Sequence, residues 1–135
     1  MSFTDYMENA LLDHIFGGQS TPAVGTLYLA LSSTTPSDDG TNFTEPSEAS
    51  YARAAILANN TNFPAAVAGS IKNGGASISF PKALESWTGP LTHFGIFNAM
   101  TNGDLLAYGA LTSSQSVVVG NVFTIPVDEL VINLT

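Results

Sequence analysis

The chain has 135 residues, enough for one domain with its own core, and 44% of them are hydrophobic while only 10% are charged. Eleven acidic residues outnumber three basic ones, and the formal net charge of -8 argues against binding to nucleic-acid phosphates or to an anionic membrane. Because the chain contains no cysteine, disulfides, thiolate nucleophiles and cysteine-based metal sites are excluded.

The first predicted element is a helix over residues 5–16. Its apolar positions recur at helical spacing, and Gly17-Gly18 ends it. Leu12 and Phe16 widen the apolar face, so the helix must pack on its own sheet or on a neighbouring subunit. The candidate interface residues are Tyr6, Leu11, Ile15, Phe16 and Trp87. For Trp87, a role as a core anchor is the equal alternative.

No basic stretch leads into an apolar one at the start of the sequence, so we expect no secretory signal and a protein that is made and kept in the cytosol. No apolar run approaches the roughly 20 residues that a membrane-spanning helix needs. We therefore predict neither membrane nor nucleic-acid partners.

After Pro22 the pattern changes to strand-like alternation. In the segment 26–32, Leu27, Leu29 and Leu31 share one face, which predicts a strand with one buried face. Further strands are predicted at 51–57, 76–80, 91–97, 105–111, 116–120, 121–125 and 129–134, with a polar, glycine-rich connection over 59–75. The turn at 101–104 is a hairpin signal.

Short strands separated by turns, without helices between them, predict a mainly β fold: an antiparallel, jelly-roll-like β-sandwich with one N-terminal α-helix. We predict a single domain over 1–135, in which residues 1–20 form the helix and its cap and residues 21–135 form the sandwich.

Residues 33–50 are predicted to form a long surface loop, because the segment is polar and contains Pro36, Gly40 and Pro46. The sole arginine, Arg53, should find a carboxylate, and Glu48 and Glu45 are the nearest in sequence. We predict a bidentate ion pair between Arg53 and Glu48 that holds this loop in place.

The sequence offers few residues for chemistry. His14 and His93 lack the partners that favour zinc, and each is interpreted as a structural histidine. Asp38-Asp39-Gly40 lacks the alternating ligands of a calcium loop, and no nucleotide-binding motif or nucleophile elbow is present. A Ser-His-Asp triad is recognised by geometry, so sequence leaves that alternative open. We predict no catalytic residues, cofactor or metal.

The order of four segments resembles a family of small bacteriophage virion proteins, described as tail fibre or head decoration proteins. The segments, which cover nearly the whole chain, are YMENALLDHIFGG, TLYLALSSTTPSDDG, TEPSEASYARAAI and SISFPKALESWTGPLTHFGIFNAMTNGDLLAYGAL. The resemblance implies a structural role in the virion and no enzyme activity. This chain has Glu48-Ala49-Ser50 where the family usually has Gly-Gly-Gly before Tyr-Ala-Arg.

Two locations in the virion compete. A capsid decoration, or cement, protein would form a homotrimer over junctions of the major capsid protein, whereas a tail fibre or baseplate component would present loop 33–50 to a host receptor. The short chain without a repeat or heptad pattern favours decoration, with other copies and the major capsid protein or other virion proteins as partners. A standalone hydrolase or lectin-like module is the third alternative.

Overall fold

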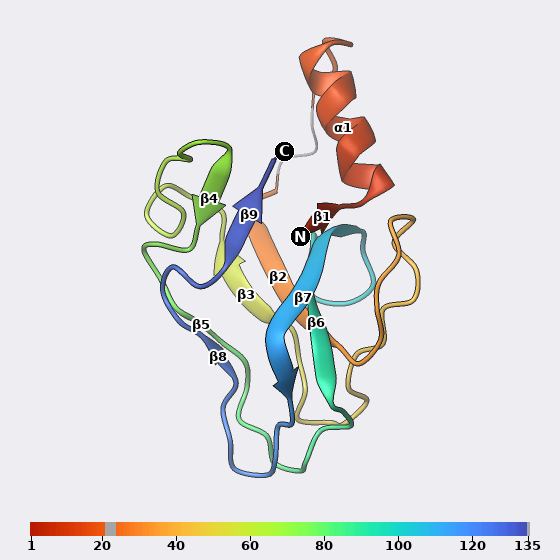
Figure 1. Cartoon of the computed structure of the whole chain (residues 1–135), viewed down its shortest axis with the longest axis vertical. Coiled ribbons are helices and arrows are strands. Elements are labelled where there is room, and N and C mark those ends of the chain that lie inside the picture. Colours follow the sequence, from red (N-terminus) through yellow and green to blue (C-terminus); the bar gives the residue numbers. More distant parts are fainter. Residues whose placement is uncertain (21–23, 135) are drawn as a thin grey trace.

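The computed structural model describes residues 1–20 and 24–134, which form an antiparallel sheet, two antiparallel ribbons and one helix. The helix is α1 (Asp5–Ile15), and the strands are β1 (Ser2–Phe3), β2 (Thr26–Ser32), β3 (Ala54–Leu57), β4 (Ser70–Lys72), β5 (Ile78–Ser79), β6 (Leu91–Phe97), β7 (Leu105–Gln115), β8 (Thr124–Ile125) and β9 (Val131–Asn133). Within the described residues the sheet has five strands in the order β1-β7-β6-β2-β3, and the ribbons are β4–β9 and β5–β8 (Figure 1).

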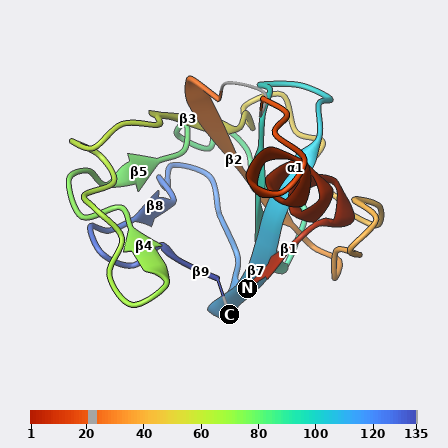
Figure 2. The same cartoon turned by 90° about the horizontal axis from the view of Figure 1, so that it is seen from above.

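The main core lies between one face of the sheet and the two ribbons. Leu29, Leu31 and Ile96 from the sheet pack with Ile78 and Ile125 from the β5–β8 ribbon. Seen from above, the ribbons lie on one side of the sheet and the 33–50 loop on the other (Figure 2). The predicted mainly β, antiparallel fold with one N-terminal helix is confirmed, and the second layer consists of ribbons instead of the second large sheet of a jelly roll.

The opposite face of the sheet is also covered, which corrects the prediction that β2 has one buried face. Leu29 and Leu31 lie in the main core, while Ala30 packs with Phe97 and Leu105 on the outer face. Phe43 from the 33–50 loop packs on this second cluster and meets Phe97 edge-on, with ring centroids 5.1 Å apart. The loop therefore closes a small second core.

The strand prediction at 116–120 is wrong. The segment forms no strand, because its backbone groups bond singly to the neighbouring loop, with Val117 O accepting from Trp87 N and Gly120 N donating to Ala83 O. The predictions at 26–32 and 91–97 match β2 and β6, whereas β1 and β4 were not predicted. The predicted boundary at residues 20 and 21 adjoins residues 21–23, which lie outside the described residues.

The β6–β7 hairpin is confirmed, with Phe97 opposite Leu105 in an antiparallel register. Asn102 and Gly103 both have positive φ angles, 54° and 72°, the conformation that the Asn-Gly signal predicts. The backbone carbonyls of Ala99 and Asn102 in this hairpin loop accept hydrogen bonds from Arg53, which follows loop 33–50 in the chain.

Candidate functional site

The 33–50 loop is an ordered structure fixed to the sheet at several points. At its beginning, the buried Ser32 hydroxyl donates to Thr34 O (2.8 Å) and accepts from the backbone N–H groups of Thr34 (3.1 Å) and Thr44 (3.0 Å). One hydroxyl thus joins the outgoing segment of the loop, at Thr34, to the returning segment, at Thr44. Such local side-chain bonds satisfy backbone groups that would otherwise need a ladder partner.

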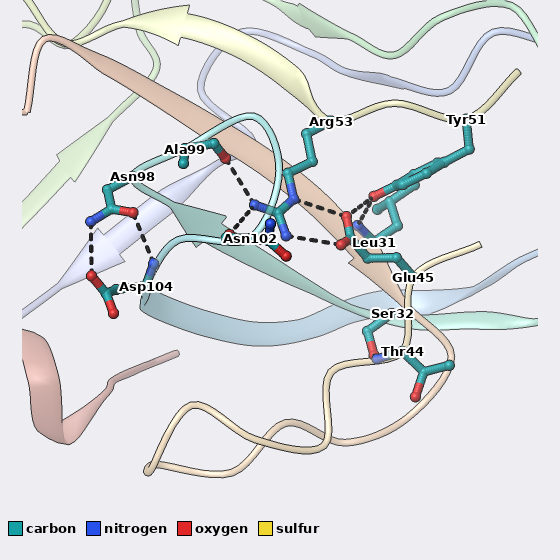
Figure 3. Close-up of polar contacts among 10 residues, drawn as sticks. All are labelled: Leu31, Ser32, Thr44, Glu45, Tyr51, Arg53, Asn98, Ala99, Asn102 and Asp104. Atoms are coloured by element: carbon teal, nitrogen blue, oxygen red, sulfur yellow. Dashed lines mark hydrogen bonds and ion pairs between the residues drawn. The ribbon is translucent and has the colours of Figure 1, made fainter. Parts of the chain in front are cut away.

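Arg53 fixes the returning end of the loop. Its Nε and Nη2 donate to the two carboxylate oxygens of Glu45 at 3.0 and 2.9 Å, and its Nη1 donates to Ala99 O and Asn102 O, both at 2.8 Å (Figure 3). The guanidinium carbon lies 3.7 Å from the centroid of the Phe97 ring. The Arg53 side chain is 6% exposed, so its guanidinium is buried and makes its hydrogen bonds and its ion pair within the protein.

The predicted partner of Arg53, Glu48, is therefore incorrect, although a bidentate pair does hold the loop. Glu45 extends toward Arg53, whereas the carboxylate of Glu48 accepts from the backbone N–H (2.7 Å) and the hydroxyl of Thr88. This hydroxyl hydrogen bond is the main reason that the pKa of Glu48 lies below its ordinary value. Glu48 thus fixes the loop at a different point, on the 81–90 segment.

Tyr51 joins the Arg53 network to the sheet. Its hydroxyl donates to Glu45 Oε1 at 2.7 Å and accepts from the backbone N–H of Leu31 at 3.1 Å (Figure 3). Burial raises the pKa of Tyr51, and the negative charge of Glu45 adds to the effect. The tyrosine therefore stays neutral and serves as a fixed hydrogen-bond donor to the ion pair.

Trp87 lies in the core, which decides between the two roles considered for it. The residue is 5% exposed, its Nε1 donates to Ser50 Oγ at 3.0 Å, and its ring meets that of Tyr51 edge-on with centroids 5.2 Å apart. Its place among the candidate interface residues is therefore corrected, because the chain's own side chains cover it.

The other candidate interface residues lie on α1, which projects from one end of the β structure (Figure 1). None of the helix residues is buried: Leu11 is half-buried, and Tyr6, Ile15 and the C-cap residue Phe16 are exposed, at 40%, 65% and 82%. Among the strands of the described residues, β7 and β1 are the main neighbours of the helix. Whether these residues meet a partner remains a prediction.

The base of α1 is held firmly although its length is exposed. The buried Thr4 hydroxyl donates to Leu105 O (2.5 Å) and Leu106 O (3.2 Å), and accepts from Met7 N (3.5 Å) as the N-cap of the helix. Asp5 N donates to Asp38 O at 2.9 Å, which connects the helix to the tip of the 33–50 loop. The helix is thus a fixed projection.

A groove runs between α1 and the adjoining end of the sheet. It encloses about 500 Å³ and is lined mainly by apolar side chains: Met1, Phe3, Leu11, Leu12, Ile15 and Leu134. Glu8 and Asp38 lie at its polar margin. Exposed apolar side chains around a hollow are the usual composition of a protein contact surface.

The histidines do not form a reactive group in the described residues. Nδ1 of His14 lies 2.8 Å from Gln19 O, and Nδ1 of His93 lies 2.8 Å from the Thr92 hydroxyl. In residues 1–20 and 24–134, no group of three or more His, Cys, Asp or Glu side chains is arranged to hold a metal ion. Over the same residues, α1 is too short and too polar to span a bilayer, and no longer apolar helix occurs.

A family model described as "Podophage GP4 fiber I protein gp80" matches residues 2–133 of the chain. The matched range includes α1, the groove residues from Ser2 to Asn133 and the anchored loop. No curated protein matches the sequence. The match confirms the resemblance to structural proteins of phage virions.

Proposed function

Because the chain belongs to the podophage GP4 fiber I protein gp80 family, we propose that it is a structural component of a bacteriophage tail fibre. The observation that carries the proposal is the family match over nearly the whole chain. The family description favours the fibre over capsid decoration, the location that the short chain without a shaft repeat suggests. The length of a chain and the absence of a repeat do not determine where on the particle the protein lies.

The arrangement of the described residues supports a structural role. The sheet, the ribbons and loop 33–50 are joined by buried contacts. In the Arg53–Glu45 pair, Arg53 also donates to two backbone carbonyls and Glu45 also accepts from the Tyr51 hydroxyl, so both side chains are held in structural contacts within the chain. We infer that the protein is not an enzyme and that it acts by joining other virion subunits through α1 and the adjoining groove.

Loop 33–50 is less suited to adapt to a receptor than an open loop would be. Pro36 and Pro46 are buried, and Phe43 packs on the sheet. The turn Asp38–Thr41 remains at the surface, where Asp39 accepts from the backbone N–H (3.0 Å) and hydroxyl (2.6 Å) of Thr41. We propose that the loop stabilises the sheet and supports the base of α1, and that any receptor contact is limited to this turn.

The location can be tested by separating phage heads from tails and detecting the protein in each fraction with an antibody. We expect it in the tail fraction, and labelling of intact particles by electron microscopy should place it on the fibres. Detection in the heads at hundreds of copies would contradict the fibre proposal and support capsid decoration.

The contact surface can be tested with the double variant Leu11→Asp/Ile15→Asp. Because neither side chain is fully buried, the variant should fold, and its thermal unfolding should stay close to that of the parent. It should fail to enter particles. Val67→Asp/Leu84→Asp is the matched control, since these exposed apolar side chains lie elsewhere and should have no effect. Equal incorporation of both variants would refute the role of α1.

The oligomeric state is a separate prediction. We propose a homotrimer, and the mass of the purified protein in solution tests this state. If the protein is a trimer, Leu11→Asp/Ile15→Asp shows whether the contact between copies uses α1.

A further inference from the structure

We propose that the α1 groove receives a basic amphipathic segment of a different virion protein, instead of a second copy of this chain. The proposal rests on the tail-fibre function above, since it specifies the partner of the same surface. The partner segment would place an apolar ridge in the groove and Lys or Arg side chains along both margins.

The apolar part of the argument comes from the side chains that the chain leaves uncovered here. Leu12 is 55% exposed, and Ile15 and Phe16 are exposed further still, all within two turns at one end of the molecule. Leu134 approaches from the end of β9 and completes the apolar lining. Burying these side chains would provide the main gain on association, since each large apolar side chain transferred from water contributes favourably.

The charge around the groove determines which partner fits. Acidic residues lie at its margin: Glu8 on α1 and Asp38 at the tip of the neighbouring loop line the groove, and Asp39 follows Asp38 in the chain. Neither α1 nor the groove lining contains Lys or Arg, and Met1 contributes only an α-amino group. The field at this end is therefore negative and attracts a cationic surface.

A second copy fits poorly for the same reason. A symmetric contact between two α1 grooves would bring equivalent carboxylates of both copies to one interface, and like charges at an interface oppose association. The chain has three basic residues to compensate them: Arg53 is buried in its own ion pair, Lys72 lies on β4 in a different hollow, and Lys82 lies between β5 and β6, outside the groove lining. A chain of different composition must supply the positive charge.

The groove is also prepared for a partner before binding. Thr4 bonds to two carbonyls of β7, and the loop tip bonds to the first residue of α1, so the helix keeps its position without a ligand. A fixed surface loses little conformational entropy on association, which favours binding of one defined segment.

Photo-crosslinking in assembled particles tests the partner directly. Leu12 is replaced by the photoreactive residue p-benzoylphenylalanine, and the same replacement at Leu84, exposed at 71%, is the matched control. After irradiation of purified particles, the crosslinked peptides are sequenced by mass spectrometry. We expect position 12 to crosslink to a different virion protein, in a segment with apolar residues at helical or strand spacing and more Lys and Arg than Asp and Glu. A crosslink to a second copy, or to an acidic segment, would overturn the proposal.

The charge requirement is tested by the variant Glu8→Gln/Asp38→Asn, which removes the two carboxylates that line the groove, with Asp128→Asn/Glu129→Gln as a control that removes two charges outside α1 and the groove lining. At low salt we expect the first variant to enter particles roughly tenfold more slowly and the control to behave like the parent, with the difference shrinking as salt is raised. Equal rates for the two variants would show that charge does not select the partner.

These experiments separate the two proposals. If the protein is in the tail but position 12 crosslinks to a second copy, the fibre function stands and the partner proposal fails. If the protein is found in heads, the fibre function fails, and a crosslink to a basic segment of a head protein would still support a basic partner for the groove.

Discussion

The substitution Glu45→Gln should destabilise the protein strongly, because it removes the charge that balances a buried guanidinium. The side chain of Arg53 is 6% exposed and that of Glu45 is 26% exposed. Removing one partner of a buried ion pair costs about 3 to 5 kcal/mol. Arg53 would keep its bonds to Ala99 O and Asn102 O, and water reaches the Glu45 side, so the cost should be near the lower value, about 3 kcal/mol.

Urea and thermal unfolding at neutral pH measure this change in the free energy of unfolding. For a chain of this size, each kcal/mol corresponds to roughly 4 °C, so the melting temperature should fall by about 12 °C. Hydrogen exchange adds a local test, since the amides of residues 33–50 should exchange faster in the variant than those of β6. Glu129→Gln, an exposed carboxylate without a hydrogen-bond partner among the described residues, is the control and should unfold like the parent.

A second substitution tests whether the unbalanced charge of Arg53 causes the loss of stability. Arg53→Met added to Glu45→Gln removes the unbalanced cation, so the double variant should be more stable than Glu45→Gln alone. A loss below about 1 kcal/mol for Glu45→Gln would mean that the pair behaves like a surface salt bridge, and the reasoning from burial would then be wrong.

Three further predictions concern the same loop. Gly95→Ala would place a methyl group 2.5 Å from a ring carbon of Phe43, so it should cost about 1 to 3 kcal/mol in unfolding experiments, while Gly25→Ala, with open space around it, should not. Ser32→Ala leaves two loop N–H groups without their acceptor, and urea unfolding should show a loss of about 1 to 3 kcal/mol, which Ser32→Thr should partly restore. The pKa of Glu48 lies below its ordinary value of 4.5, so its stabilising effect is present above that pH and disappears as the pH falls through the lowered value. Thermal unfolding below pH 4.5 should therefore depend less on pH in Glu48→Gln than in the parent, and identical slopes would contradict this.

Local patterns in the sequence were enough to predict α1, β2, β6 and the β6–β7 hairpin. These elements depend on neighbouring residues: helical spacing before Gly17, alternation in 26–32, and the Asn-Gly turn at 102–103. The family resemblance was also readable from sequence, since it depends on the order of segments and not on their positions in space.

Local patterns also predicted one strand that the structure does not contain and missed two that it does. The segment 116–120 contains three consecutive valines, which favour a strand, yet it forms none, because its hydrogen bonds go to the 81–90 segment and not to a continuous ladder. The strands β1 and β4 are short, at two and three residues, and their pairing partners are β7 and β9, far along the chain. Periodicity does not detect pairing of that kind.

Composition and sequence order determined the class of this protein: mainly β, acidic, free of cysteine and related to phage structural proteins. Only the tertiary structure decided which carboxylate pairs with Arg53, that Trp87 lies in the core, and that α1 stands exposed beside an apolar groove. Glu45 and Glu48 are both near Arg53 in sequence, and only the path of the loop places one beside the guanidinium and the other beside Thr88. Secondary structure follows from residues close in the chain, whereas burial and pairing depend on which distant segments the fold brings together.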